Sequence, residues 1–324
     1  MTRRQFIVTT AAALATTHIQ AQPAWPLAKP ITLIAPFSAG GNVDTTARLV
    51  AHKLEQRLKQ TIVIENLPGA GGLVGVGKAA AAAADGYTLV MAFDGPVAIT
   101  RYVNPQAMRF DVNRDLVPVA LTTTAPMVLV ARPTLEVRSL PEFVALARAQ
   151  PGRLSYATSG VGPVLHLAME MIKERARLFI VHIPYRGGAQ IATDVIGGQV
   201  DLAMMVSTSA TPHVLAGRMK AIAVTGNKRL AQMPGVPTLD ESALFKGLDV
   251  VSWTGVFAPS RTPAAIVERL NAEINEVLRL DDVRGKLAEG GALVAQLSQA
   301  AFAQFVRNEQ QRFEKIVKSA NIQE

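Results

Sequence analysis

The sequence of 324 residues has no cysteine and few aromatic residues. The absence of cysteine excludes a disulfide framework, a cysteine-ligated zinc or iron–sulfur centre and a thiol nucleophile, but it does not exclude export. Aromatic residues make up 5% of the chain, and no three basic residues are consecutive. The basic stripe and stacking surface typical of nucleic-acid binding are therefore missing, and we expect no nucleic-acid partner.

Charged residues are also scarce, at 18% of the chain against roughly 25% in typical soluble domains. Hydrophobic residues reach 49% but are spread along the chain rather than gathered into long spans, which argues against disorder and against a polytopic membrane protein. The net charge of +8 falls to +6 without the first 21 residues, which contribute Arg3 and Arg4 and no acidic residue. The length suits one large domain or two ordinary domains.

The amino-terminal residues have the layout of a secretory signal. Arg3 and Arg4 form a short basic head, residues 6–15 are apolar, and small or polar residues follow up to Ala21. The stretch Thr2-Arg3-Arg4-Gln5-Phe6-Ile7 resembles the twin-arginine export motif. We expect residues 1–21 to be a signal peptide that is cleaved near Ala21, without a lipid anchor because no cysteine is present, and a mature protein that is soluble in the periplasm.

The first part of the chain repeats a pattern of strand, glycine turn and helix. Ile31 to Phe37 is a short apolar run that ends at Ser38-Ala39-Gly40-Gly41, and apolar residues then recur at helical spacing from Val43 to Leu58. The pattern is repeated by a strand at 61–65, a turn at 68–72, a helix at 73–84 and a strand at 87–93. Strands that alternate with helices of this length predict parallel pairing in an α/β sheet.

A second α/β unit follows. A long β-rich stretch at 116–130 is interrupted by Pro126, and Ser139-Leu140-Pro141-Glu142 is a capping box that starts a helix through Ala149. Further strands are expected at 154–158, 179–183, 201–206, 221–225 and 250–257, with helices at 165–174, 189–196, 262–280 and from 298 onward. This order predicts a first domain that is interrupted by a second domain and completed by the carboxyl-terminal residues.

The two glycine turns that precede helices, at 38–41 and 68–72, are the most informative chemical feature. Free N–H groups and the positive end of a helix dipole favour a carboxylate or phosphate at such a turn. Glycine is equally expected wherever a strand-to-helix turn is tight, so the pattern alone leaves both interpretations open. Neither turn is a P-loop, because no Gly-Lys-Ser/Thr follows, and Gly69-Ala70-Gly71-Gly72 lacks the dinucleotide fingerprint.

Residues for catalysis or metal binding are few. Ser159 lies outside any nucleophile-elbow pattern, and His166, seven residues further on, is explained by capping or packing. His52, His182 and His213 lack metal-ligand spacing. We expect no enzymatic activity, no cofactor and no metal, and we retain a serine hydrolase that uses Ser159 and His166 as a weaker alternative.

Several longer motifs occur in one order along the chain: Pro36-Phe37-Ser38-Ala39-Gly40-Gly41-Asn42-Val43-Asp44-Thr45-Thr46-Ala47-Arg48, Glu65-Asn66-Leu67-Pro68-Gly69-Ala70-Gly71-Gly72, Asp85-Gly86-Tyr87-Thr88-Leu89, His166-Leu167, Pro184-Tyr185-Arg186-Gly187, Gly198-Gln199-Val200-Asp201 and Trp253-Thr254-Gly255-Val256-Phe257-Ala258-Pro259. In this order and spacing the chain resembles the receptors of tripartite tricarboxylate transporters, the TctC or Bug family of periplasmic binding proteins. The resemblance covers nearly the whole mature chain.

The resemblance implies a two-domain, hinged α/β fold of the type II periplasmic-binding-protein kind, with the ligand in the cleft between the domains. Together with the order of elements, it gives domain one at 22–123, domain two at 124–246 and the completion of domain one at 247–324. The residues that it implies for ligand binding are Pro36, Phe37, Ser38, Ala39, Gly40, Gly41, Asn42, Gly69, Ala70, Gly71, Gly72, Asp94, Thr158, Ser159, Gly160, Val161, Gly162, His166 and Met205.

The implied role is a monomeric receptor that captures a small organic carboxylate and delivers it to the large and small membrane subunits of a transporter. A sensory partner of a membrane kinase is the alternative.

Family members often carry a polar residue at Val161, a serine at Pro163 and an aspartate at Met205, so this chain offers fewer polar contacts from domain two. Asp94 stands where a small hydroxyl residue is common, and a carboxylate at the cleft would repel a second ligand carboxylate. We therefore expect a monocarboxylate with an aromatic or amino-acid-like body rather than citrate. Capping by Asp94 of the helix or loop after its strand is the alternative.

Overall fold

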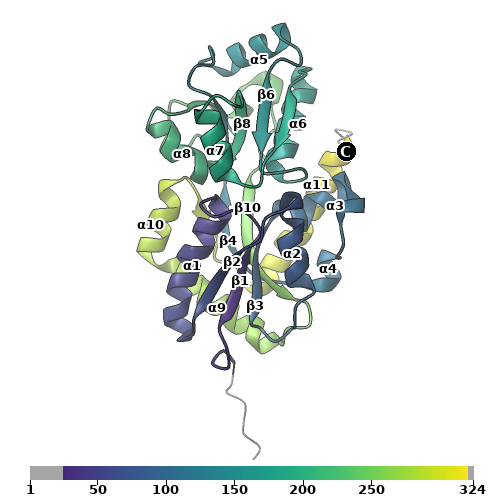
Figure 1. Cartoon of the computed structure of the whole chain (residues 1–324), viewed down its shortest axis with the longest axis vertical. Coiled ribbons are helices and arrows are strands. Elements are labelled where there is room, and N and C mark those ends of the chain that lie inside the picture. Colours follow the sequence, from purple (N-terminus) through teal and green to yellow (C-terminus); the bar gives the residue numbers. More distant parts are fainter. Residues whose placement is uncertain (1–24, 320–324) are drawn as a thin grey trace, which may run out of the picture.

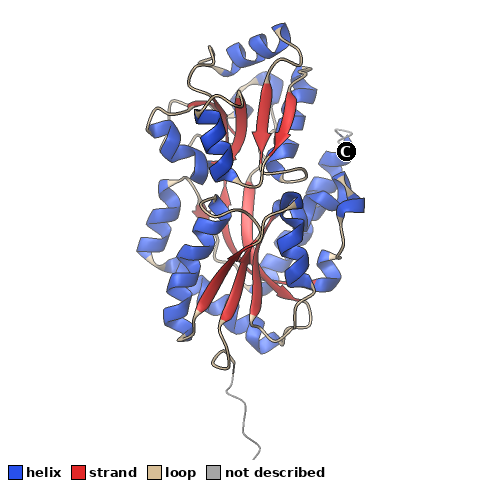
Figure 2. Cartoon of the chain, viewed as in Figure 1, coloured by secondary structure: helices blue, strands red, loops and turns tan. Residues whose placement is uncertain are grey.

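The computed structural model describes residues 25–319, so the expected signal peptide lies outside the described residues. The chain forms two α/β domains, one above the other in Figure 1, and each is built on its own β-sheet. Helices flank both sheets (Figure 2). The α/β class that the alternating pattern predicts is confirmed.

Domain one contains a six-stranded sheet within the described residues. Its strand order is β11-β4-β10-β3-β1-β2, with β1 at Ile31–Ala35, β2 at Ile62–Asn66, β3 at Thr88–Phe93, β4 at Leu116–Ala125, β10 at Ser252–Pro259 and β11 at Leu293–Val294. β1 pairs in parallel with β2 and β3, whereas β10 runs antiparallel to β3 and β4. The parallel pairing expected for the first three strands is confirmed. The direction of β10 was not predicted, because hydrophobic periodicity reports burial and not the direction of a neighbouring strand.

Helices cover this sheet with apolar faces. In α1 (Asn42–Leu58), Val50 and Leu54 lie on the buried face and Asp44 lies in the first turn, where a carboxylate suits the helix dipole. α2 ends at Ala80, short of the expected end at Ala84, because residues 81–84 have no buried face to support a helix. Helix α2 spans Leu73–Ala80. The other segments of this domain are η1 (Ala70–Gly72), η2 (Gly95–Ile99), α3 (Thr100–Val103), η3 (Pro105–Ala107), α4 (Val112–Asp115), α9 (Ala264–Arg279), α10 (Asp281–Glu289) and α11 (Gln299–Ser319).

Domain two contains a five-stranded sheet within the described residues, in the order β7-β6-β8-β5-β9. Its elements are β5 (Met127–Ala131), α5 (Leu140–Ala149), β6 (Ser155–Thr158), α6 (Val164–Ala176), β7 (Val181–Pro184), α7 (Gly188–Ile196), β8 (Leu202–Val206), α8 (Ser207–Leu215) and β9 (Lys220–Val224). β6 pairs in parallel with β7 and β8, and β5 runs antiparallel to β8 and β9. The sequence pattern does not predict α8, because its serines, threonines and internal Pro212 are poor helix formers.

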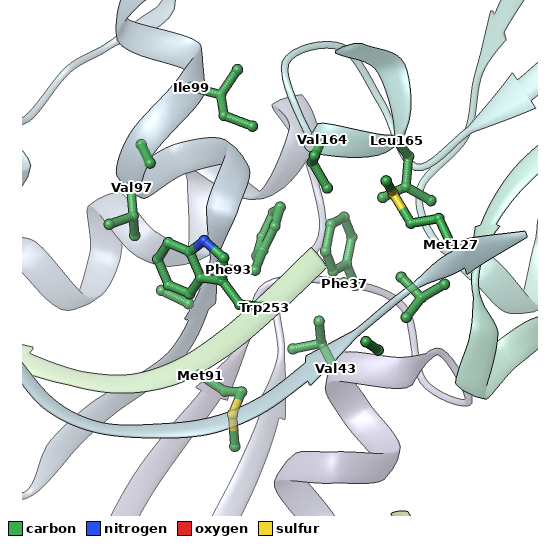
Figure 3. Close-up of a cluster of buried hydrophobic side chains, with 14 of the residues drawn as sticks. Phe37, Val43, Met91, Phe93, Val97, Ile99, Met127, Val164, Leu165 and Trp253 are labelled. Carbon is green, nitrogen blue, oxygen red and sulfur yellow. The ribbon is translucent and has the colours of Figure 1, made fainter. Parts of the chain in front are cut away.

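The chain crosses between the sheets at Pro126, which separates β4 from β5, and again between β9 and β10. The η4 (Leu239–Glu241) and η5 (Ala243–Phe245) turns lie on the second crossing. A continuous apolar cluster joins the domains: Figure 3 shows Phe37, Phe93 and Trp253 from domain one beside Val164 and Leu165, the first residues of α6. The two domains are thus packed together at the base of the cleft that separates them.

Candidate functional site

The carboxyl ends of the parallel strands of both domains face each other across this cleft. Domain one contributes the loop at 36–41 after β1 and the loop at 67–72 after β2, and domain two contributes the loops at 159–163 and 185–187 after β6 and β7. The loops touch across the cleft. A Cβ built on Gly71 would lie 2.6 Å from the carbonyl oxygen of Val161, and one built on Gly40 would lie 3.6 Å from the Cβ of Ala189.

A cavity of about 340 Å³ lies between these loops. Of the residues that the sequence analysis selects, Ala70, Gly71, Gly160 and Val161 line it. The wall also contains residues that were not selected: Leu73, Thr100, Asn104, Ala107, Pro184, Tyr185 and Arg186. Pro184, Tyr185 and Arg186 could have been selected from the sequence, because they belong to the motif Pro184-Tyr185-Arg186-Gly187 at the end of a strand. Thr100 and Asn104 follow the irregular segment after β3, for which the sequence gives no such signal.

Three helices begin at the cleft without a side-chain cap. Their N-cap residues, Gly41 of α1, Gly72 of α2 and Gly187 of α7, have no side chain that could accept a hydrogen bond from the first N–H groups. The helices α8, α9 and α10 also lack a side-chain cap, but their N-cap residues are not glycine, and α5 at the top of Figure 1 is capped by the hydroxyl of Ser139. Uncapped N–H groups and the positive ends of three helix dipoles make this cleft attractive to an anion.

The first glycine loop, at 36–42, is held in shape by a buried carboxylate. Asp44 accepts hydrogen bonds from the Gly40 N–H at 2.9 Å, the Arg48 Nε at 3.0 Å and the Asn66 Nδ2 at 2.8 Å. Burial acts to raise the pKa of Asp44, but these hydrogen bonds outweigh it and lower the pKa below its ordinary value. The Ser38 N–H of this loop donates to the carbonyl oxygen of Arg186 in domain two at 3.4 Å. The loop therefore closes one end of the cleft rather than lining the cavity.

Phe37 belongs to the apolar cluster between the domains. Its ring packs on Phe93 with centroids 4.6 Å apart (Figure 3), and its side chain is buried. The expected role of Phe37 in ligand binding is therefore limited to supporting the loop that it belongs to.

The second glycine loop needs its glycines. Gly69, Gly71 and Gly72 all have positive φ, and the intervening Ala70 has φ of 46°. An alanine in the left-handed region is uncommon, and such strain often accompanies a functional loop. Gly71 also lies against the Val161 carbonyl oxygen, so a side chain at this position would meet domain two.

The loop of domain two at 158–162 is anchored from behind by a stack of rings. The Thr158 hydroxyl donates to the Gly160 carbonyl oxygen at 2.8 Å and lies 2.7 Å from the His182 Nε2. The His182 ring is stacked between His166 and Tyr156, with centroids 4.4 and 4.7 Å away.

Burial, with a smaller contribution from His166, lowers the pKa of His182 to about 4, so the ring is neutral at physiological pH. A neutral ring whose Nε2 carries the proton can donate to Thr158 while Thr158 donates to Gly160. Thr158 and His166 therefore support the loop, and Ser159 and Gly162 lie within it. Gly162 is pressed against Thr100 of domain one.

Asp94 does not lie on an open wall of the cleft, contrary to the expectation that it could contact the ligand. Its side chain is 0% exposed. Oδ1 accepts a hydrogen bond from the Val164 N–H at 2.9 Å, and Oδ2 accepts from the Ser252 Oγ at 2.8 Å and from the Trp253 N–H at 3.3 Å. Burial raises the pKa of Asp94 to about 6 against these hydrogen bonds. The alternative of capping is closer to the structure, but the capped helix is α6 of the other domain.

Met205 is also displaced from its expected position at the cleft. Its side chain is 1% exposed and packs in the apolar core of domain two with Val128, Ile191 and Met219. Side chains alternate along β8, and Met205 points to the covered face of the sheet. It therefore contributes to the stability of the domain and not to the wall of the cavity.

Within residues 25–319, no group of three or more histidine, cysteine, aspartate or glutamate side chains could hold a metal ion. None of the helices in that range combines the length and the hydrophobicity that a membrane crossing needs. Two α/β domains that enclose a small cavity with glycine loops and helix N-termini define a solute-binding protein.

The comparisons with known proteins give the family. The profile described as "Tripartite tricarboxylate transporter family receptor" matches residues 46–322. The chain therefore belongs to this family of receptors. A UPF0065 protein from the tcbD–tcbE intergenic region of Pseudomonas sp. (strain P51) is 37% identical over 317 residues, which is 97% of this chain and 94% of that protein. Protein BugT of Bordetella pertussis is 33% identical over 292 residues, covering 90% of this chain and 89% of BugT.

Solved structures agree with the fold. Rpa4515 of R. palustris with adipate has a TM-score of 0.87 at 33% identity, covering 92% of this chain and 98% of that one. MatC of Rhodopseudomonas palustris with bound malate has a TM-score of 0.86 at 33% identity, covering 90% of this chain and 100% of that one. The two-domain periplasmic-binding-protein fold and the family that the motifs indicate are confirmed.

Proposed function

We propose that this receptor captures a small organic monocarboxylate in the 340 Å³ cavity and delivers it to a tripartite tricarboxylate-type membrane transporter. The observation that carries the proposal is a cavity lined by glycine loops of both domains and by Leu73, the first residue of the uncapped helix α2. The uncapped helices α1 and α7 begin at the same cleft, next to the residues that line the cavity. Backbone N–H groups hold a carboxylate without an ion pair, so the ligand can be released when the domains separate. Two structural neighbours with adipate and malate, which are both dicarboxylates, support a small organic carboxylate as the ligand.

The wall of the cavity favours one negative charge over three. Arg186 is the cationic residue among those that line the cavity, and Leu73, Ala107, Val161 and Pro184 supply apolar surface. A single carboxylate with an apolar or aromatic body matches one cationic side chain beside apolar walls, whereas the further carboxylates of citrate would lie against these apolar side chains. Because both oxygens of Asp94 are already hydrogen-bonded inside the protein, an ammonium group on the ligand has no partner there, and an amino-acid-like ligand is no longer favoured.

The transport role includes export and closure. We propose that the mature chain acts in the periplasm as a monomer, and that the crossings at Pro126 and between β9 and β10 act as hinges for the domains assigned to 22–123, 124–246 and 247–324. We propose that the protein binds its ligand without catalysing a reaction. Thr158 and His166 support the loop at 158–162 in this arrangement.

Native mass spectrometry of gently purified mature protein, followed by calorimetry with benzoate and citrate, tests the proposal. We expect a retained monocarboxylate, tighter binding of benzoate than of citrate, and weaker benzoate binding by roughly tenfold or more in Arg186→Gln, because one charge-assisted hydrogen bond is lost. Arg218→Gln, at an exposed arginine of domain two outside the cavity, is the matched control and should bind as the unmodified protein does. Tight citrate binding, or no binding of any carboxylate by the unmodified protein, would contradict the proposal.

A further inference from the structure

Asp94 connects the two domains through a single buried carboxylate. One of its oxygens is held by domain one, through the Ser252 hydroxyl and the Trp253 N–H of β10. The other oxygen accepts a hydrogen bond from the Val164 N–H, the first residue of α6 in domain two, at 2.9 Å. The hydrogen bond therefore joins residues that are 70 positions apart and belong to different domains.

We propose that Asp94 is an interdomain clasp, a positioning residue that holds the cleft closed in the absence of ligand. The Asp94 carboxylate accepts a hydrogen bond from the N-terminus of α6, just as the carboxylate of a ligand would accept hydrogen bonds from the uncapped helix N-termini of the cleft. Its relevance to ligand capture rests on the proposed function, but the closure that it causes is a property of the ligand-free chain.

The helix α6 depends on this remote residue for a cap. Its own N-cap residue, Pro163, has no polar side chain, and no side-chain cap is formed from that position. A carboxylate at the N-terminus of a 13-residue helix gains both a charge-assisted hydrogen bond and a favourable interaction with the helix dipole. In this chain the carboxylate comes from across the domain boundary, so the gain is made only when the domains are together.

The clasp lies beside the surfaces that separate when the cleft opens. A Cβ built on Gly95, next to Asp94, would lie 3.1 Å from the Cα of Pro163, and a Cβ on Gly71 would lie 3.6 Å from the Cδ of Pro163. The same proline thus contacts the segment of Asp94 and the glycine loop that lines the cavity. A movement that draws the 159–163 loop away from Gly71 also stretches the hydrogen bond between Asp94 and Val164. The Asp94 carboxylate and the Val164 N–H would then form hydrogen bonds with water.

The size of the effect follows from the loss of one hydrogen bond to a charged group. Removing it should raise the ratio of open to closed ligand-free molecules roughly 10- to 100-fold. The serine substitution, Asp94→Ser, removes both the charge and the reach to Val164. Asp94→Asn keeps the shape and one oxygen that can accept from the Val164 N–H, but it removes the charge and places an NH2 donor opposite the Trp253 N–H. We therefore expect a smaller shift in the same direction.

Pulsed electron–electron spin resonance on the ligand-free protein tests the clasp. The chain has no cysteine, so spin labels can be placed at single cysteines introduced at the exposed positions Gln56 of α1 and Ala145 of α5, one in each domain. We expect a compact distance distribution for the unmodified chain, and a population at longer distance in Asp94→Ser and, to a lesser extent, in Asp94→Asn.

The matched control is Asp201→Asn. Asp201 pairs with Arg132 and accepts from the Ser155 N–H, all within domain two, so its loss should not alter the interdomain distance. Distributions that are identical in the unmodified chain and in both Asp94 variants, with circular dichroism showing folded protein, would overturn the clasp and leave Asp94 as a fixed structural cap. Because no ligand is present, this result is independent of the proposed function. That function fails separately if no carboxylate binds.

Discussion

Replacing Asp94 by asparagine should change how the stability of the protein depends on pH. Burial raises the pKa of Asp94 from its ordinary value of 3.8 to about 6, despite hydrogen bonds from Val164, Ser252 and Trp253. A carboxyl group whose pKa is raised by folding binds its proton more tightly in the folded state. Its contribution to stability is therefore full below pH 3.8 and is lost as the pH rises through about 6.

The magnitude follows from the difference between the two pKa values. About two pKa units correspond to roughly 3 kcal/mol in the free energy of unfolding between the fully protonated and the fully ionised carboxyl group. Between about pH 4.5 and 7.5, single-site linkage gives about 2 kcal/mol of this difference. Asparagine does not titrate. We therefore expect the free energy of unfolding of the unmodified protein, minus that of Asp94→Asn, to fall by about 2 kcal/mol over this range.

Urea unfolding followed by circular dichroism at several pH values measures this difference. The other carboxylates are common to both proteins and cancel. Asp44→Asn provides a control at a second buried carboxylate. Burial acts to raise the pKa of Asp44, but hydrogen bonds from Arg48, Gly40 and Asn66 leave it below its ordinary value of 3.8, so its stabilising effect is lost only at lower pH. The difference in the free energy of unfolding between the unmodified protein and Asp44→Asn should not change with pH in this range. If the difference for Asp94→Asn does not change either, the argument that burial raises the pKa of Asp94 is refuted.

Gly71→Val should lower the melting midpoint at least as much as Gly217→Val. Both glycines have positive φ, where a branched side chain costs about 1–2 kcal/mol, and a Cβ at Gly71 also meets the Val161 carbonyl oxygen. Only Gly71→Val should also lose the rise in midpoint on adding benzoate, because its Cβ would meet the Val161 carbonyl oxygen, whereas nothing lies within 4 Å of a Cβ at Gly217. A preserved rise would show that the loop does not contact ligand. In the precursor, Arg3→Lys combined with Arg4→Lys should leave the protein in the cytoplasm on cell fractionation. Normal export of that variant would indicate the general secretory route.

Much of the fold can be predicted because the first two strands of domain one, β1 and β2, are each followed by a glycine turn and an amphipathic helix. The expected helix at 43–58 corresponds to α1 at Asn42–Leu58, and the interruption at Pro126 separates β4 from β5. Hydrophobic periodicity is local and reports which face is buried. It does not report which strand lies alongside, so the antiparallel pairing of β10 with β3 and β4 was missed.

The site could be predicted where the backbone itself carries the chemistry. Gly71 belongs to a glycine turn at a strand end that is visible in the sequence, and Gly160 was implied by the family resemblance. Both line the cavity. The positions of the Asp94 and Met205 side chains could not be predicted. The sequence does not show whether a carboxylate or a thioether at the end of a strand faces the cleft or the interior. The partner that decides the role of Asp94, Val164, is 70 residues away and in another domain. Such a contact follows from the packing of the domains and not from any local pattern.

With a clasp at Asp94 and a ligand beside Arg186, affinity and selectivity depend on different residues. The observed affinity of a hinged receptor is its intrinsic affinity reduced by the fraction of molecules that can close on the ligand. A clasp at Asp94 has both of its oxygens hydrogen-bonded inside the protein, so it changes that fraction equally for every ligand. Arg186 lines the cavity, so it changes the intrinsic affinity according to the charge of the ligand. The ranking of ligands therefore belongs to the cavity wall, while Asp94 sets how readily the cleft closes on any of them.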